Sequence, residues 1–319
     1  MIDFFIIGEP LYGMASTQED VDLEHVTEFK RYMAGAEVNV AVGIARLGFK
    51  SVYFTQLGND VFAKYIVEEL EKNKIDTKYI LYTDEYNTAF QLKSKVSKGD
   101  PVFGYLRKKS AGKFIDKNKV DEIDFSSLKL LHLTGLYASL SENTYDIVEL
   151  IIEKAKKSKI FISFDPNLRP QLWKDEKTMI EKINKLAFSS NLFMPGLSEG
   201  KLLSGCETPT DIASFYLDKG VEMVVIKLGP SGAFVKTKDE EYIVDGFIID
   251  KVVDTVGAGD GFAVGVVSGL LNKFSLKESV KRGCAIGALA VTKMGDNEGY
   301  PDEEALQIFM KEAKRYKND

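Results

Sequence analysis

The sequence predicts an α/β protein with a parallel central sheet and a smaller β element. Apolar runs typical of buried strands alternate with helical patterns along most of the 319 residues. This β-α order implies parallel strands joined by right-handed crossovers. Between Thr88 and Gly112 the pattern changes to two alternating strands, which predicts a hairpin apart from the main sheet. The length fits one large α/β domain, residues 1–319, with an accessory element.

The expected elements follow in order, and most of the apolar runs end in a polar, proline or glycine-containing loop. In open α/β sheets, ligands bind beyond such strand ends. The helix expected over 37–47 should be amphipathic, and Gly48 should end it. In chain order we expect a strand over 1–9, a helix over 37–47, a strand over 51–55, a helix over 60–72, and strands over 130–135, 160–165, 192–194, 223–227 and 248–253.

Charge and hydropathy exclude several classes of protein. The net charge of −6 arises from 42 basic and 48 acidic residues dispersed along the chain, so no basic field favours nucleic acid or an anionic membrane. No apolar run approaches the roughly 18 to 20 residues that span a bilayer. The first residues carry an early acid and no basic segment of the kind that opens a signal peptide. We therefore expect a cytoplasmic protein without a membrane or nucleic-acid partner.

Cysteine and histidine are scarce. The chain has two cysteines, Cys206 and Cys284, and two histidines, His25 and His132. This inventory argues against a zinc cluster and offers no disulfide framework.

A glycine-rich stretch, Asp254-Thr255-Val256-Gly257-Ala258-Gly259-Asp260, precedes an apolar helical pattern. Its small residues leave the backbone free to point several N–H groups at one place. The unpaired amides and positive dipole end of a helix then favour phosphate oxygens. Asp260 would lie in the first turn, either as a cap or as a base beside the anion.

This stretch resembles the C-terminal signature of the ribokinase-like (PfkB) carbohydrate kinases, and residues 34–41 with 45–48 resemble the N-terminal one. The resemblance implies a three-layer α/β/α sandwich with a β-lid formed from roughly 10–33 and 88–112, through which a homo-oligomer would assemble. It also implies ATP, Mg²⁺ and a monovalent cation as cofactors. By the same resemblance, Asp260 is the catalytic base, Gly257, Ala258 and Gly259 form the anion hole, and Gly35 and Asn39 contact the sugar.

Two further loops follow strands. Lys227-Leu228-Gly229-Pro230-Ser231-Gly232 resembles the family's ATP-side loop, and it lacks the Gly-Lys-Ser/Thr ending of a P-loop. The resemblance assigns Lys227, Gly229, Gly232, Gly257 and Gly259 to the nucleotide. In Asp165-Pro166-Asn167-Leu168-Arg169-Pro170 it assigns Asn167 to the phosphates and Arg169 to the substrate, and a guanidinium can hold an oxyanion with two parallel hydrogen bonds.

Other motif matches are weaker. Gly196-Leu197-Ser198-Glu199-Gly200 matches the nucleophile elbow of serine hydrolases, but no histidine follows position 132 to complete a triad. In the kinase family this site has Asn-x-x-Glu and helps to organise magnesium. Glu199 remains and Gly196 replaces the Asn, so we expect Glu199 to reach the metal directly or through water. A dinucleotide-binding loop is disfavoured because the glycine-rich stretch comes late in the chain.

The substrate is suggested by the lid. Residues 105–112, Tyr-Leu-Arg-Lys-Lys-Ser-Ala-Gly, resemble a stretch of the 2-keto-3-deoxygluconate kinases, in which the Tyr and Arg meet the carboxylate. The resemblance implies phosphorylation of that sugar acid by ATP. A fructokinase is the alternative, and a non-catalytic sugar-binding regulator is the alternative from another class. The expected substrate-binding residues are Gly35, Asn39, Gln91, Tyr105, Arg107, Arg169, Asp260 and Asp296.

Overall fold

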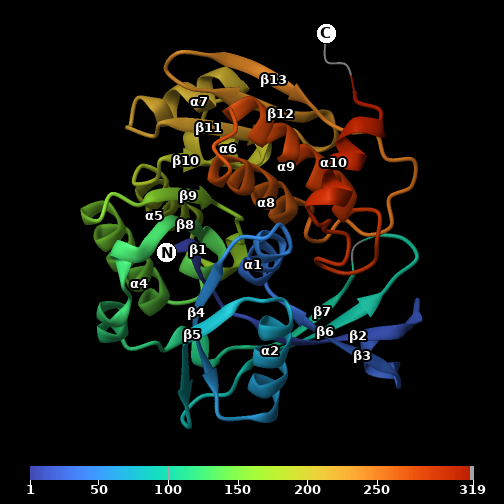
Figure 1. Ribbon diagram of the computed structural model, residues 1–319. Helices are drawn as coiled ribbons and strands as arrows, with labels where there is room; N and C mark the ends of the chain where they lie inside the picture. The colour runs from blue at the N-terminus through green and yellow to red at the C-terminus, as the bar shows by residue number, and fades with distance from the viewer. Residues whose placement is uncertain (100, 317–319) are drawn as a thin grey trace.

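The computed structural model describes residues 1–99 and 101–316 and has a large sheet with helices on both faces (Figure 1). Its strand order is β13-β12-β11-β10-β9-β8-β1-β4-β5, and neighbours are parallel from β11 to β5. β12 is antiparallel to both β11 and β13. The mostly parallel sheet is confirmed. The strands are β1 (Ile2–Ile7), β4 (Ser51–Gly58), β5 (Asp76–Thr83), β8 (Leu128–Thr134), β9 (Phe161–Asp165), β10 (Leu192–Phe193), β11 (Met223–Lys227), β12 (Gly232–Lys236) and β13 (Glu241–Asp245).

The helices cover the sheet in two groups, each packed on its own apolar cluster. Because side chains alternate along a strand, β1 sends Phe5 and Ile7 into one cluster and Phe4 and Ile6 into the other. One group is α4 (Glu142–Lys157), α5 (Glu176–Ala187), α6 (Leu197–Ser204) and α7 (Pro209–Leu217), with the short α3 (Gly135–Ala138) at the end of β8. The other is α1 (Ala36–Arg46), α2 (Val61–Lys72), α8 (Ala258–Leu271), α9 (Leu276–Ala290) and α10 (Glu303–Glu312).

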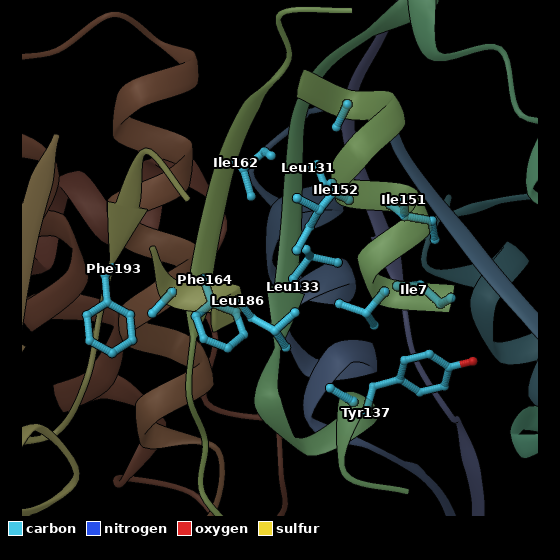
Figure 2. Close-up of a cluster of buried hydrophobic side chains, with 14 of the residues drawn as sticks. Ile7, Leu131, Leu133, Tyr137, Ile151, Ile152, Ile162, Phe164, Leu186 and Phe193 are labelled. Carbon is cyan, nitrogen blue, oxygen red and sulfur yellow. The ribbon is translucent and has the colours of Figure 1, made fainter. Parts of the chain in front are cut away.

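The first of these clusters is shown in Figure 2. Leu131 and Leu133 of β8 lie near Ile151 and Ile152 of α4. The ring of Phe164 stacks on that of a phenylalanine from β10 with the centroids 5.9 Å apart. These strand and helix side chains form one apolar cluster that supports β9, whose last residue, Asp165, lines a cavity at the carboxyl edge of the sheet.

Helix α1 differs from the expected amphipathic helix, because its residues from Glu37 to Ala45 are all buried. It lies between the large sheet and α8, so neither side faces solvent. Gly43 permits this approach, since a Cβ there would lie 2.5 Å from Val264 of α8. Two polar residues on this helix, Glu37 and Asn39, are therefore held inside the protein.

A small second sheet stands off the main body (Figure 1). It has the order β3-β2-β6-β7 and is built from β2 (Leu11–Glu19), β3 (Phe29–Ala34), β6 (Ala89–Lys95) and β7 (Phe103–Leu106). The expected hairpin is present as the antiparallel pair of β6 and β7. The small sheet fits the lid expected from roughly 10–33 and 88–112, of which residue 100 lies outside the described residues.

The strand expected over 248–253 is wrong. This segment follows β13 as a loop, and its N–H groups at Ile248 and Val253 donate to the carbonyls of Lys314 and Val291. Its apolar side chains at Ile249 and Val252 line a cavity instead of pairing in a sheet. Apolar content alone did not distinguish a strand from the wall of a cavity.

In the part of the chain described, no helix is both long enough and apolar enough to cross a bilayer.

Candidate active site

A cavity of about 550 Å³ lies between the small sheet and the carboxyl ends of the large sheet's strands. The lid contributes Phe103 and Tyr105, while Asp165 and Lys227 come from the ends of β9 and β11. This is the region where an open α/β sheet binds ligands. Residues predicted from separate motifs meet here: Gly35, Asn39, Gln91, Tyr105, Arg107, Asn167, Arg169, Glu199, Lys227, Gly257, Gly259, Asp260 and Asp296.

A second cavity, of about 340 Å³, has mainly apolar walls. It holds the remaining predicted residues, Gly229, Gly232 and Ala258, and it adjoins the first cavity through three shared residues, Lys227, Thr255 and Gly259. Sequence reasoning did not predict the apolar wall of this cavity, which includes Phe247, Ile249, Val252, Phe262, Cys284 and Val291.

The loop between the cavities requires glycine at position 257. Gly257 is the N-cap of α8 with φ at +78°, and a Cβ there would lie 1.8 Å from the carbonyl oxygen of Asp296. The first turn of a helix leaves its N–H groups without intrahelical partners. The amides that open α8 can therefore bind an anion where the two cavities meet.

Asp260 is buried at the start of α8, with 9% of its surface exposed. Its Oδ2 accepts a hydrogen bond of 2.8 Å from Nδ2 of Asn39, and its Oδ1 accepts one of 3.3 Å from Nδ2 of Asn167. Burial raises the pKa of Asp260 to about 7, although the Asn39 amide opposes the rise. A carboxylate with this pKa is suited to take up a proton near neutral pH.

The amide of Asn39 is itself oriented. Its Oδ1 accepts a hydrogen bond of 3.0 Å from Nδ2 of Asn297, which leaves Nδ2 of Asn39 to face Asp260. Arg46 in turn donates to the Asn297 side chain at 3.3 Å and to its backbone carbonyl at 2.5 Å. Sequence reasoning placed Arg46 and Asn297 in stretches that resemble the family but assigned neither a role, since their role depends on a contact between chain segments about 250 residues apart.

Lys227 is held as a cation where the two cavities join. Its Nζ lies 2.7 Å from Oδ2 of Asp165. Burial lowers the pKa of Lys227, but the nearby carboxylates of Asp165, Glu199 and Asp260 outweigh it and the net direction is upward. The ammonium is therefore available to an anion bound at the junction.

Glu199 and Asn167 connect loops at the cavity wall. Glu199 accepts hydrogen bonds from the backbone N–H of Leu168 at 2.8 Å and from that of Gly196 at 2.7 Å, so each carboxylate oxygen has one protein partner. Asn167 has φ at +37°, which is uncommon for a residue with a side chain. Backbone strain of this kind clusters at functional sites, where surrounding contacts maintain it.

The far end of the larger cavity holds a buried ion pair. Nη2 of Arg107 lies 2.5 Å from Oε2 of Glu9, and Glu9 also accepts a hydrogen bond from Ser110. Nearby, Gln91 donates a 2.6 Å hydrogen bond to the hydroxyl of Tyr32. Sequence reasoning missed Glu9 as the partner of Arg107.

Arg169 lies at the rim. Its Nη1 donates to the carbonyl of Leu168 at 2.8 Å and the residue is exposed. It therefore has freedom to approach a ligand.

Comparisons with known proteins show which family the chain belongs to. A family model described as pfkB family carbohydrate kinase matches residues 1–303. The chain belongs to this family. The kinase is 43% identical over 310 residues to a 2-dehydro-3-deoxygluconokinase of Bacillus subtilis (strain 168), covering 97% of this chain and 95% of that protein. The resemblance to PfkB carbohydrate kinases is confirmed.

Solved structures confirm the ribokinase-like fold of the kinase. A crystal structure of a PfkB protein from Polaromonas sp. JS666 matches with a TM-score of 0.89 at 36% identity, covering 97% of this chain and 99% of that one. A putative ribokinase II from E. coli, in complex with ATP and Mg²⁺, matches with a TM-score of 0.90 at 25% identity, covering 98% and 99%.

A magnesium ion fits the kinase through a nucleotide rather than through a protein cage. Among the described residues, no group of three or more His, Cys, Asp or Glu side chains is placed to hold a metal. Mg²⁺ commonly keeps several waters and binds one or two carboxylates together with substrate phosphates. The donor set here, with Asp165 and Glu199 lining the larger cavity, suits that mode.

Proposed function

We propose that the kinase transfers the γ-phosphoryl group of ATP to the terminal hydroxyl of 2-keto-3-deoxygluconate, giving the 6-phosphate. We choose a sugar acid as the substrate because Arg107 has a buried donor that lacks a hydrogen-bond partner in the described part of the chain. This guanidinium lines the larger cavity, and its buried Nε makes no hydrogen bond within the described residues. A buried donor without a partner is costly, and a carboxylate is the ligand that best satisfies a guanidinium. The name of the Bacillus subtilis relative supports the same substrate.

The proposed roles follow from the positions of the groups. The sugar would lie between the lid and α8, held by Gly35, Asn39, Gln91, Tyr105, Arg107, Arg169 and Asp296. The adenine would lie in the apolar cavity beside Gly229 and Gly232, and the phosphates would extend to the junction near Asn167 and Lys227.

The chemistry centres on Asp260. As the sugar hydroxyl oxygen bonds to the γ-phosphorus, Asp260 accepts its proton and the bond to the bridging oxygen of ADP breaks. The amides of Gly257 to Asp260 and the ammonium of Lys227 stabilise negative charge on the transferred group. Bound Mg²⁺ would neutralise phosphate charge, with Glu199 contacting it through water. Closure of the lid would exclude water and limit ATP hydrolysis.

A substrate panel tests the proposal. Turnover with ATP is measured for 2-keto-3-deoxygluconate, fructose, ribose and tagatose. A neutral sugar leaves the buried Nε of Arg107 without an acceptor, while Glu9 still pairs with Nη2. An unsatisfied buried donor on a charged group costs about 3 kcal/mol. This predicts at least about a hundredfold preference for the sugar acid in kcat/KM. Equal efficiency with fructose would refute the sugar-acid assignment and leave the kinase fold unaffected.

The variant Arg107→Ala tests the carboxylate contact directly. We expect a higher KM for the sugar acid and an unchanged KM for ATP, because Arg107 does not line the apolar cavity. Lys108→Ala is the control, since Lys108 is the exposed neighbour on the same segment. An equal rise of KM in both variants would contradict a specific role for Arg107.

The lid is also our proposed route to a homo-oligomer. Leu106 and Val102 are 72% and 61% exposed at the edge strand β7 and the turn before it. Apolar side chains gathered on one exposed edge mark a surface that can pair with a second copy. Light scattering should detect an oligomer for the wild type and monomers for Leu106→Glu.

We also propose that the kinase requires a monovalent cation. This requirement is tested by comparing kcat in potassium and tetramethylammonium salts.

A further inference from the structure

A buried lysine connects the lid to the loop that opens α8. Lys93 lies on β6 of the small sheet, and its Nζ is 3.2 Å from Oδ2 of Asp254 and 3.2 Å from Oδ1 of Asp296. The three side chains are only 7%, 8% and 9% exposed. The partners lie 161 and 203 residues away in the sequence, so this contact joins separate parts of the fold.

Both carboxylates hold the backbone around Gly257. Oδ1 of Asp254 accepts a hydrogen bond of 3.1 Å from the N–H of Val256, inside the glycine-rich loop. Oδ2 of Asp254 accepts another, of 3.3 Å, from the N–H of Gly295. The carbonyl oxygen of Asp296 lies 1.8 Å from the position that a Cβ on Gly257 would take. Both aspartates therefore contact the backbone that leads to the amides at the start of α8.

The same strand also faces the sugar cavity. Gln91 lies two positions before Lys93, so the two side chains leave the same face of β6, and Gln91 lines the larger cavity. Nζ of Lys93 lies 5.9 Å from the ring centroid of Phe103, another lid residue that lines this cavity. A sugar that positions the lid therefore acts on the strand that carries Lys93.

Lys93 also compensates the charge of the two aspartates. Burial raises the pKa of Asp296, while the Lys93 ammonium opposes that rise and the Asp254 carboxylate adds to it. Without the ammonium, two buried carboxylates would share a small space, which is strongly unfavourable. The Lys93 ammonium offsets this repulsion and so stabilises the loop in its present shape.

We infer that Lys93 is a positioning residue for phosphoryl transfer, which aligns the anion-hole amides with the lid through Asp254 and Asp296. It does not touch the reacting atoms. This inference rests on the proposed anion hole, and it is independent of which sugar the kinase phosphorylates.

The test compares Lys93→Met, which keeps the length and removes the charge, with Lys93→Arg and with Lys95→Met. Lys95 lies on the same strand, and its ammonium pairs with Glu19 at the surface. We expect Lys93→Met to lower kcat at least about tenfold with the KM for ATP within about twofold of wild type. Lys93→Arg should recover much of the loss, and Lys95→Met should match the wild type.

Two further variants separate a positioning role from a structural one. If Lys93 acts through Asp254, the double variant Lys93→Met/Asp254→Asn should lose little more kcat than Lys93→Met alone. If Lys93→Met fails to fold, Asp254→Asn alone should show the same fall in kcat without a change in the KM for ATP. A folded Lys93→Met with wild-type kcat, or a double variant whose losses simply add, would overturn the inference. Failure of the anion-hole proposal itself would instead appear as normal kcat in Gly257→Ala.

Discussion

Replacing Asp260 by Asn should slow the kinase and, at neutral pH and above, stabilise it. The pKa of Asp260 is about 7 in the folded protein, against an ordinary value of 3.8. Because the folded state binds this proton more tightly than the unfolded chain, ionisation of Asp260 opposes folding. The unfavourable contribution is absent below pH 3.8, grows as the pH rises to about 7 and is then constant. At its full size it corresponds to about 4 kcal/mol, at about 1.4 kcal/mol for each tenfold change in proton affinity.

An asparagine at this position cannot ionise, so the variant lacks this cost. Between pH 5 and pH 8 the stability of Asp260→Asn relative to wild type should rise by about 2 to 3 kcal/mol. Its amide oxygen can still accept the hydrogen bond from Asn39, whereas its amino group meets the Asn167 amide with a second donor. The free energy lost with the Asn167 hydrogen bond does not depend on pH. The change in relative stability between pH 5 and pH 8 therefore reports the ionisation of Asp260.

The assay is urea unfolding of both proteins at the two pH values, together with kcat at pH 8. Loss of a general base lowers kcat by about 10²- to 10⁴-fold. Asp175→Asn is the control, because Asp175 is an exposed N-cap whose pKa lies below its ordinary value owing to its hydrogen bonds with Thr178. It should show no gain at pH 8. A stability difference for Asp260→Asn that stays constant with pH, or near-normal kcat, would refute the reasoning.

Three further predictions concern the rim, the loop and the core. Arg169→Ala should lower kcat and raise the KM of the sugar acid without weakening ATP binding, and equal loss of ATP affinity would contradict its place at the rim. Gly257→Ala should abolish most activity because its Cβ would clash with a backbone oxygen, whereas Gly205→Ala, also at positive φ but with open space around it, should stay active in the same assay. Ile151→Ala should destabilise the protein by about 2 to 5 kcal/mol in urea unfolding, and Ile308→Ala, which is 50% exposed, by far less.

The sequence predicted the parts of the site that are contiguous in the chain. The stretch from Asp254 to Asp260 is contiguous, so its local pattern predicted a loop that opens a helix, and its resemblance to the family signature supplied the proposed anion hole and base. Six strands of the large sheet were likewise predicted, because each is an apolar run flanked by loops, whereas β5, β12 and β13 were not predicted. Lys227 was proposed because its loop, at the end of such a strand and next to two glycines, resembles the family's ATP-side loop.

The sequence could not predict contacts that only the tertiary fold creates. A lysine in an alternating strand is usually a solvated charge, and nothing next to Lys93 indicates that two aspartates will surround it. Glu9 likewise gave no sign that it would pair with Arg107. The burial of α1 was missed because helical periodicity does not reveal a second layer of cover. Residues 248–253 have the composition of a strand but close a cavity, and composition cannot separate these outcomes.

The wall shared by the two cavities has a consequence for inhibitor design. Since Lys227, Thr255 and Gly259 line both spaces, one layer of residues lies between the proposed nucleotide and sugar positions. A single molecule that joins adenosine to a sugar acid through a short chain of phosphates could then occupy both cavities at once. Binding of its first half would hold the second half at an effective concentration in the millimolar range, so the affinity of the joined compound should exceed that of either part by orders of magnitude.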